Sequence, residues 1–228
     1  MKKIAGLFLL TLTTAAIGAE TKYSLPPVLG GVVRSEKWVM RKNPPEEEFS
    51  GKVSYKNPNY DIKADWALYK RTEEIITLRG NVRGALKKEG EETRFQSHSA
   101  EYRHKTGEIW LRPENDRDRV RIFHDDPKQG NWTSVSKTAY IDQKAQSALL
   151  GGGARVTDGK MSSLSREAEY FNGKGLFRLT GGRPVVWGKF DTYDFAIQGD
   201  RAEASKFYNT VTVEGRTRGW IRVPDKEK

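Results

Sequence analysis

The chain has 228 residues and carries 40 lysines and arginines against 30 aspartates and glutamates, which gives a formal net charge of +10. It has no cysteine, so its stability must come from packing and backbone pairing without disulfides. A basic surface suits a polyanion such as the phosphates of a membrane glycolipid. The basic residues are dispersed among acidic ones, however, and a solvated, mildly basic face is an equally good interpretation.

The first nineteen residues are typical of an export signal. Lys2 and Lys3 form a positive start, residues 4–17 are apolar, and small residues up to Ala19 offer cleavage positions. The apolar run is shorter than the roughly 20 residues of a membrane-spanning helix; an uncleaved inner-membrane anchor is the alternative. We therefore expect a signal peptide at residues 1–19 and an exported protein, and export argues against nucleic acid as a partner.

Residues 20–48 are expected to form an extended arm. Proline and glycine pairs interrupt it, and Glu46 to Glu48 close it with a run of charge. A segment so rich in breakers is not expected to form a central strand, so it is either a flexible spacer or the cover of a sheet edge. Residues 224–228 are expected to be a polar tail, which leaves one domain at residues 49–223.

This domain has the pattern of an all-β fold, and helical periodicity is weak. Apolar and polar side chains alternate, as in strands with one buried and one wet face, in residues 61–65, 76–79, 120–123 and 211–214. Two segments that contain breakers, residues 112–119 and 125–131, are expected to be hairpin tips.

A repeat runs through the domain. Ala67 is followed eleven residues later by Leu78 and thirteen residues later by Gly80. Similar sets are Ala100, Leu111 and Pro113; Ala139, Leu149 and Gly151, one residue short; Ala168, Leu179 and Gly181; and Ala202, Val213 and Gly215. The alanines recur every 29 to 39 residues, the period of an array whose units bury a shared face. We expect about five stacked strand pairs, preceded by a half-unit at residues 49–53, that form two facing sheets with an apolar slot between them.

These residues resemble the LptA/OstA family of lipopolysaccharide transport proteins. Residues 62–69 with residues 76–82 are similar to the repeat of that family, and later copies lie at residues 168–170, 179–182 and 197–202. The resemblance spans residues 49–223, although only the first unit keeps Asn-Val after its glycine. It implies an OstA-like folded β-jelly-roll trough in the periplasm that shields the acyl chains of lipopolysaccharide or a similar glycolipid.

The resemblance also implies partners. These are homologous transport components at the inner and outer membrane, an ATP-driven complex that supplies energy, and head-to-tail self-association of the chain. It leaves open whether this chain is the bridge between the membranes or the component on the inner-membrane side.

Residues in inward phase are the candidates for the trough wall. An acyl chain gains about 0.8 kcal/mol for each methylene that leaves water, so a continuous dry wall is enough for binding. For any single residue, ordinary core packing is an equally good interpretation. The candidates are Ile62, Ala64, Ile76, Leu78, Val82, Phe95, Leu111, Leu149, Leu164, Phe177, Leu179, Val185, Ile197, Val211 and Val213.

The pattern favours no catalytic, cofactor or metal site. His98 and His104 are six residues apart, but their spacing matches no familiar ligand set, and two exposed polar residues are the simpler interpretation. His124 begins a polar turn, and no serine or carboxylate pair lies in a nucleophile or glycosidase frame. The alternative function is a carbohydrate-binding β-sandwich or a structural envelope protein, which would need an exposed row of the tryptophans Trp66, Trp110, Trp132, Trp187 and Trp220.

Overall fold

The computed structural model describes residues 30–128, 130–205 and 210–223. The predicted signal at residues 1–19, the first part of the predicted arm and the tail at residues 224–228 lie outside them. Eighteen strands in the described residues form one antiparallel sheet, so the fold is all-β, as predicted. No helix among those residues is long and apolar enough to cross a membrane.

The strands follow one another with short connections, and one 3-10 turn lies between β12 and β13. They are β1 (Val32–Arg34), β2 (Lys37–Lys42), β3 (Pro45–Lys56), β4 (Tyr60–Lys70), β5 (Ile75–Lys88), β6 (Glu91–Arg103), β7 (Glu108–Arg112), β8 (Val120–Asp125), β9 (Trp132–Ser136), β10 (Thr138–Asp142), β11 (Ser147–Thr157), β12 (Met161–Phe171), β13 (Leu176–Thr180), β14 (Val185–Phe190), β15 (Tyr193–Gln198), β16 (Arg201–Ser205), β17 (Thr210–Glu214) and β18 (Arg218–Arg222).

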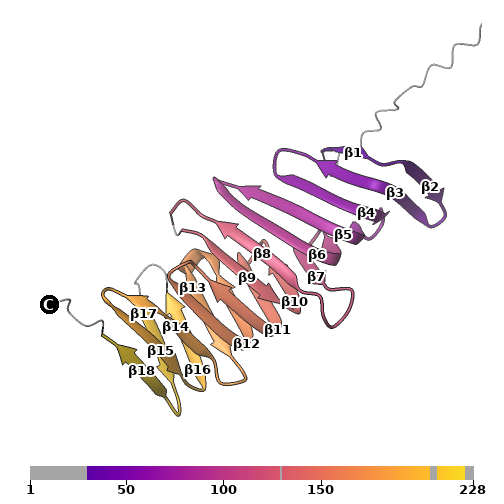
Figure 1. Ribbon diagram of the computed structural model, residues 1–228. Helices are drawn as coiled ribbons and strands as arrows, with labels where there is room; N and C mark the ends of the chain where they lie inside the picture. The colour runs from indigo at the N-terminus through magenta and orange to yellow at the C-terminus, as the bar shows by residue number, and fades with distance from the viewer. Residues whose placement is uncertain (1–29, 129, 206–209, 224–228) are drawn as a thin grey trace, which may run out of the picture.

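The long strands are bent at a crease that divides the sheet into two faces. The pairing of β3 with β4 shifts register between Ser50 and Val53, and that of β11 with β12 shifts between Gly151 and Ala154. We call one side the repeat face: β2, β7, β10, β13, β16, β17 and the adjoining halves of the long strands. The opposing face holds β1, β8, β9, β14, β15, β18 and the other halves. Figure 1 shows the strands stacked along one axis, from β1 and β2 at one end to β17 and β18 at the other.

The short strands are long strands interrupted at the crease. β7 and β8 both lie along β6, β9 and β10 both lie along β11, and β13 and β14 both lie along β12. Residues 113–119 therefore cross from one face to the other, and the prediction of a hairpin tip there was wrong. Pro113 stands where other units have the repeat glycine, and the chain leaves the strand at this point. Residues 126–131 do join the antiparallel pair β8 and β9, so the second predicted hairpin is confirmed.

The repeat residues form one row across the repeat face. Each alanine pairs in register with the leucine or valine of its own unit, and each unit pairs with the next. The row runs Trp38, Phe49, Ala67, Leu78, Ala100, Leu111, Ala139, Leu150, Ala168, Leu179, Ala202 and Val213. Alternation of small and large side chains lets neighbouring strands interdigitate along the inside of the crease. The row holds six pairs in the described residues, because Trp38 and Phe49 add one before the five that we predicted.

Leu150, not Leu149, is the leucine of the third unit. Leu150 pairs with Ala139 and is fully buried, whereas Leu149 is 43% exposed. The unit therefore keeps the full spacing, and its crease glycine is Gly152, which has a φ of +74°. The prediction of Leu149 was wrong because it took the first glycine of the run, Gly151, as the repeat glycine, whereas the offsets of eleven and thirteen residues seen in the other units lead from Ala139 to Leu150 and Gly152.

The crease needs glycine because the chain turns there with little room. Gly80 has a φ of +72°, a conformation that side chains with a Cβ rarely adopt, and a Cβ at this position would clash with the Asp65 carboxylate. The next residue, Asn81, donates from its Nδ2 to the Asp65 carboxylate at 2.7 Å. The last unit repeats the arrangement with a charged pair, since Arg216 lies 2.8 Å from Asp200.

The domain begins before the predicted boundary at Phe49, which falls inside β3. In the described residues β1 and β2 each pair with β3 alone, so this part of the arm covers a sheet edge, one of the two alternatives that we left open. The run Glu46 to Glu48 lies in β3 between β2 and β4, a central position that we had excluded. It is tolerated because Arg71 pairs with the buried Glu47 at 2.6 Å, while Arg41 pairs with Glu48 at 2.6 Å.

Candidate functional site

The candidate site is the interior between the two faces. A second row on the repeat face lies further from the crease and runs Glu47, Tyr69, Ile76, Tyr102, Ile109, Ile141, Ala148, Tyr170, Phe177, Ala204 and Val211. The facing row on the opposing face runs Tyr55, Ile62, Gly84, Phe95, Ile122, Ser134, Val156, Ser163, Val186, Ile197 and Gly219. The two rows form a wall that is largely apolar from one end of the array to the other.

Cavities that lie along this interior in the described part of the chain grow toward the C-terminal end. The first, about 50 Å³, is bounded by Phe49, Tyr55, Tyr69 and other apolar side chains of both faces. The central cavity has a volume of about 440 Å³. The third, about 620 Å³, is bounded by apolar residues of β14, β15, β17 and β18, including Trp220. In the described residues the trough is therefore closed at its N-terminal end and open at its C-terminal end.

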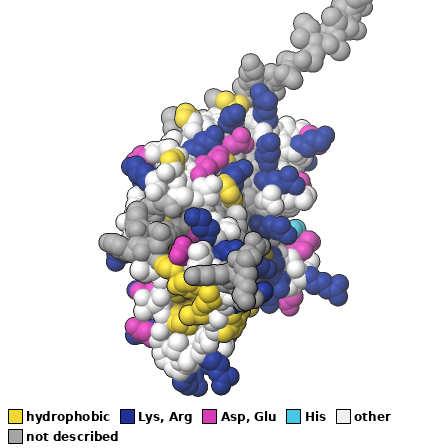
Figure 2. All heavy atoms as spheres, turned by 60° about the vertical axis from the view of Figure 1, so that its left-hand side comes forward, with side chains coloured by type: hydrophobic (Ala, Val, Ile, Leu, Met, Phe, Trp, Pro, Cys, Tyr) yellow, Lys and Arg dark blue, Asp and Glu magenta, His cyan; other side chains and the backbone are white. Residues whose placement is uncertain are grey.

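The open end exposes apolar side chains. Phe190, Trp220, Ile221 and Val223 are all exposed there, and Ile221 keeps 67% of its surface accessible. Figure 2 shows hydrophobic side chains gathered on the end of the molecule that comes forward, with lysines and arginines around it. In the described residues β17 pairs only with β16 and β18 only with β15, so both terminal strands leave one edge unpaired.

An aromatic cluster fills the middle of the trough between the two faces. The Trp132 ring lies 5.0 Å from Tyr170 and 5.2 Å from Phe177, with edge-to-face geometry. The His124 ring lies 5.4 Å from Trp132 and 5.6 Å from Tyr170. Burial raises the pKa of Tyr170 to about 12. Trp132 and His124 come from the opposing face and the other two from the repeat face, so the cluster joins the two faces halfway along the interior.

Lysines lie at the mouth of the central cavity. Lys87, Lys88 and Lys144 are exposed and border it, together with the acidic Glu91 and Asp142. Deeper in, the boundary is formed by Ile122, Ile141 and Trp132 among other side chains. The cavity thus combines an apolar floor with a charged mouth.

Three of the predicted wall residues point away from the interior. Leu164 is 50% exposed and pairs with Arg155 and Val185 on the outer side of the opposing face. Val185 shares that outer side, and its neighbour Val186 is the buried one. Leu149 lies on the outer side of the repeat face opposite Tyr140 and Glu169. These three predictions were wrong.

Serines at inward positions caused the error in β12. Ser163 and Ser165 are buried on either side of the exposed Leu164. In this part of the strand the polar residues therefore face inward and the apolar residue faces outward, the reverse of the usual pattern. The Ser165 hydroxyl donates to the Glu167 carbonyl at 2.7 Å, and Ser136 bonds in the same way to the Thr138 carbonyl at 3.0 Å. A serine just before the bend therefore satisfies its own hydroxyl through a carbonyl two residues later.

The remaining candidates lie on the inner side of the two faces. They are Ile62, Ala64, Ile76, Leu78, Val82, Phe95, Leu111, Phe177, Leu179, Ile197, Val211 and Val213. Those that border a cavity, and so can touch a ligand, are Ile62, Ala64, Ile76 and Leu78 at the N-terminal end and Ile197 and Val211 at the open end. Leu111 and Leu179 are fully buried core residues.

The five tryptophans considered for a sugar-binding row form no common platform. Trp132 is buried in the interior, Trp220 lies at the open end, and the other three lie on outer sides of the sheet. Each of those three is covered by an arginine: Arg79 over Trp66, Arg103 over Trp110 and Arg155 over Trp187. An exposed row for stacking on sugar rings is therefore not formed.

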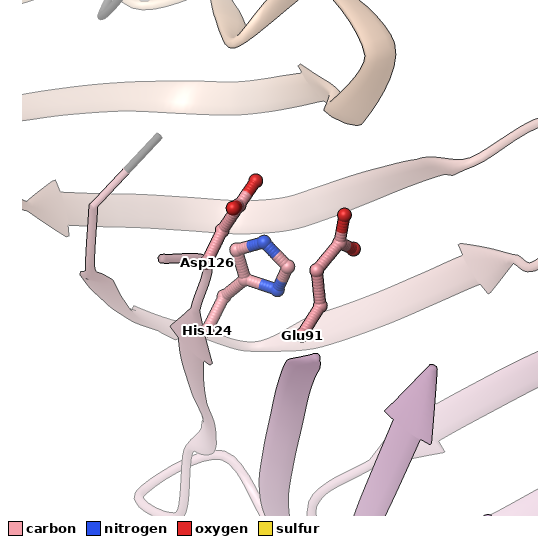
Figure 3. A group of neighbouring side chains, drawn as sticks. All are labelled: Glu91, His124 and Asp126. Carbon is pink, nitrogen blue, oxygen red and sulfur yellow. The ribbon is translucent and has the colours of Figure 1, made fainter. Parts of the chain in front are cut away.

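Sequence reasoning missed three titratable groups that meet beside the central cavity. Glu91, His124 and Asp126 each offer a ligand atom, and these atoms all lie within 4.8 Å of one another. Figure 3 shows the His124 ring between the two carboxyl groups. The sequence offered a signal only for His124 and Asp126, because residues two apart along a strand share one face. His98 and His104 are not in this group; they lie beside Glu114 and Tyr102.

Comparison with known proteins adds little to this geometry. No protein-family model matches the chain, and no curated protein matches it. A solved structure that it resembles is LptH from Pseudomonas aeruginosa, described as the LptA homologous periplasmic component of the lipopolysaccharide transport device. The match has 8% sequence identity and a TM-score of 0.28, and it covers 66% of this chain and 81% of that chain. A likeness this slight carries no argument, so the fold assignment rests on the strand order and the functional proposal on the interior.

Proposed function

We propose that the chain is an exported lipid carrier that holds an anionic glycolipid, such as lipopolysaccharide, by its acyl chains in the trough. The observation that carries the proposal is the pair of facing, largely apolar rows along the whole array, with cavities that widen toward an open, apolar end. An acyl chain gains about 0.8 kcal/mol for each methylene that enters such an interior. Binding then needs no reaction and no cofactor.

The charged mouth of the central cavity favours an amphiphile over a plain hydrocarbon. Lys87, Lys88 and Lys144 would meet phosphate or carboxylate groups while the acyl chains lie below them. The predicted export signal and the resemblance of the repeat to the LptA/OstA family agree with a periplasmic role. Passage of lipid between inner and outer membrane, driven by an ATP-consuming complex, is the function that these features favour.

End-to-end assembly is part of the proposal. The strands with an unpaired edge in the described residues are β1 and β2 at one end and β17 and β18 at the other, and unpaired edges template pairing with another chain. A head-to-tail contact that does not close into a ring would extend the trough. At the N-terminal end β1 and β2 pair with β3, so these two strands, and not β3, would meet the neighbour's β17 and β18.

Photo-crosslinking in the native cell tests lipid binding. A photoreactive residue would replace Ile141, Ile197 or Val211 inside the trough, and Leu149 or Leu164 as matched apolar controls on the outer sides. We expect lipopolysaccharide adducts at the first three positions and none at the controls. Adducts at neither set in a folded, exported protein, or equal adducts at both sets, would exclude the trough as the binding site.

A second measurement separates this function from the carbohydrate-binding alternative. The purified protein would be offered intact lipopolysaccharide and the same polysaccharide without acyl chains. A lipid trough loses its affinity when the acyl chains are removed, because the apolar contacts disappear. Undiminished binding of the delipidated polysaccharide would favour the alternative.

A further inference from the structure

We propose that Glu91, His124 and Asp126 form a binding site for one divalent transition-metal ion of the Zn²⁺ type. The inference stands independently of lipid binding, since it rests on the polar ligand atoms of three side chains beside the central cavity and not on apolar contacts. Glu91 begins β6, His124 lies in β8, and Asp126 directly follows β8. Their ligand atoms all lie within 4.8 Å of one another.

The donor set fits such an ion. Zn²⁺ is held by imidazole nitrogens at roughly 2.0–2.1 Å and carboxylate oxygens at roughly 2.0–2.2 Å, in a tetrahedral arrangement that leaves a fourth position for water in open sites. One nitrogen and two oxygens that lie within 4.8 Å of one another are close enough for side-chain adjustment around a single ion, and Figure 3 shows the three side chains side by side. Imidazole with carboxylates favours a transition metal over Mg²⁺ or Ca²⁺, which prefer oxygen ligands alone.

Asp126 supplies an independent observation. It is 1% exposed, and among the described residues its Oδ2 has no hydrogen-bond donor, while its Oδ1 accepts only from the Lys128 backbone N–H at 2.7 Å. Neither Asp126 nor Glu91 forms an ion pair with a lysine or arginine in the described part of the chain. A buried carboxylate oxygen without a donor is costly, and a bound cation is one of the few things that explain it.

The surroundings orient two of the ligands. Thr93 Oγ1 lies 2.8 Å from His124 Nδ1, and a proton on Nδ1 shared with this hydroxyl gives Nε2 the lone pair that coordinates. The tautomer is inferred from that contact. Asn172 donates from its Nδ2 to Glu91 Oε2 at 2.9 Å, and Asn172 also accepts from the Tyr170 hydroxyl at 3.1 Å. Supporting hydrogen bonds of this kind are typical of metal ligands.

The site has a route to solvent. Glu91 and His124 both border the central cavity of about 440 Å³, which opens past the lysines at its mouth. An ion bound here would tie the end of β8 to the start of β6, next to the Trp132 and Tyr170 rings that join the two faces. It would thereby fix this corner of the opposing face, with its fourth position facing the cavity.

Metal titration of the untagged full chain tests the site. The protein would be treated with a chelator, dialysed and titrated separately with Zn²⁺, Co²⁺ and Mg²⁺, with stoichiometry, the visible spectrum of Co²⁺ and the melting temperature as readouts. We expect one Zn²⁺ per chain, a Co²⁺ spectrum of low coordination number, a higher melting temperature with Zn²⁺ and no saturable response to Mg²⁺. Absence of one-to-one binding would overturn the proposal.

Variants separate this site from adventitious binding. Asp126→Asn and Glu91→Gln keep the shape of the side chain, so they remain informative if His124→Gln does not fold. Each of the three variants should lower the affinity for Zn²⁺ at least tenfold. Thr93→Val, which removes only the supporting hydroxyl, should weaken it by about 10–100-fold. His98→Gln is the matched control, since His98 lies beside Glu114 at the crease, and should leave binding unchanged. Equal binding by wild type and all three ligand variants would mean an adventitious ion only.

Discussion

The two ends of the trough use the same bent strands but close to different degrees. At the N-terminal end the faces leave a cavity of about 50 Å³, whereas at the C-terminal end they leave about 620 Å³. The difference follows from side-chain size at equivalent places in the two inner rows. Tyr69 and Tyr102 stand near one end of the repeat-face row where Ala204 and Val211 stand near the other.

The opposing face shows the same contrast. Tyr55 begins its row and Gly219 ends it. The backbone pairing is the same in each unit. The volume between the faces is set locally by the side chains that project into it, because a packed interior tolerates few voids. A trough that is closed at one end and open at the other can therefore be made from one repeating unit.

The largest difference between the ends is expected in stability. Leu78→Ala removes a side chain of the closed end that is packed between both faces and should lower the free energy of unfolding by about 2–5 kcal/mol. Ile221→Ala at the open end should change it by less than about 0.5 kcal/mol, because Ile221 is already exposed. Denaturant unfolding of both variants measures this contrast. Equal losses would show that the open end is covered in solution.

The crease can be tested by adding a methyl group. Gly80→Ala should cost about 1–3 kcal/mol, because the residue holds a positive φ and the new Cβ meets the Asp65 carboxylate. Gly90→Ala is the matched control, with a φ of +89° but no atom within 4 Å of its Cβ, and should cost less. Thermal unfolding ranks the two variants. A larger loss for Gly90→Ala would mean that the crease relaxes around the new side chain.

Filling the open end should reduce lipid binding without a comparable loss of stability. Val211→Trp places an indole ring in the cavity of about 620 Å³ and would displace roughly two methylenes of a bound acyl chain, so affinity should fall by about tenfold. Thr212→Trp, on the exposed side of the same strand, is the control and should leave affinity unchanged. Lipid titration followed by tryptophan fluorescence compares the two. If the control weakens binding as much as Val211→Trp, the acyl chains do not occupy this cavity.

The smallest expected effect is a pH dependence at the crease of the open end. The hydrogen bond from Arg216 holds the pKa of Asp200 below its ordinary value of 3.8. A carboxyl group whose pKa is lower in the folded state stabilises the fold at pH values above its unfolded pKa. This stabilisation is lost as the pH falls through the folded pKa, so the free energy of unfolding should decrease below about pH 4. Asp200→Asn should weaken this pH dependence of the free energy of unfolding, and the difference between the variant and the wild type should shrink in salt because the ion pair is exposed. An unchanged slope would assign the acid sensitivity to other carboxylates.

Much of the fold was predictable because its register follows the spacing of small and large residues. The steps from Ala67 to Leu78 and from Ala168 to Leu179 predicted strand pairs that do face each other. Leu149 and Leu164 were misplaced for different reasons. The offsets of the other units lead from Ala139 to Leu150 and Gly152, but the prediction took the first glycine of the run. Around Leu164 the buried residues are serines, so the apolar alternation has the wrong phase, and a hydrogen bond such as that of the Ser165 hydroxyl to the Glu167 carbonyl lets a serine turn inward.

The cluster of Glu91, His124 and Asp126 could not be predicted from the sequence as a whole, for a different reason. Glu91 is far from His124 along the chain, and only the pairing of β6 with β8 brings them together. His98 and His104 were the histidines that the sequence placed near each other, yet in the folded chain they lie with different neighbours. Proximity that arises from strand pairing is a property of the tertiary structure.

The sequence by itself determined the all-β class, the repeating unit and the row of alanines and leucines, because these depend on local alternation and on spacing along one chain. The tertiary structure alone decided where the faces close and where they open, because cavity volume depends on which side chains meet across the two faces. It likewise decided that the charged run at Glu46 to Glu48 lies in a central strand, since only the folded chain brings Arg41 and Arg71 to Glu48 and Glu47.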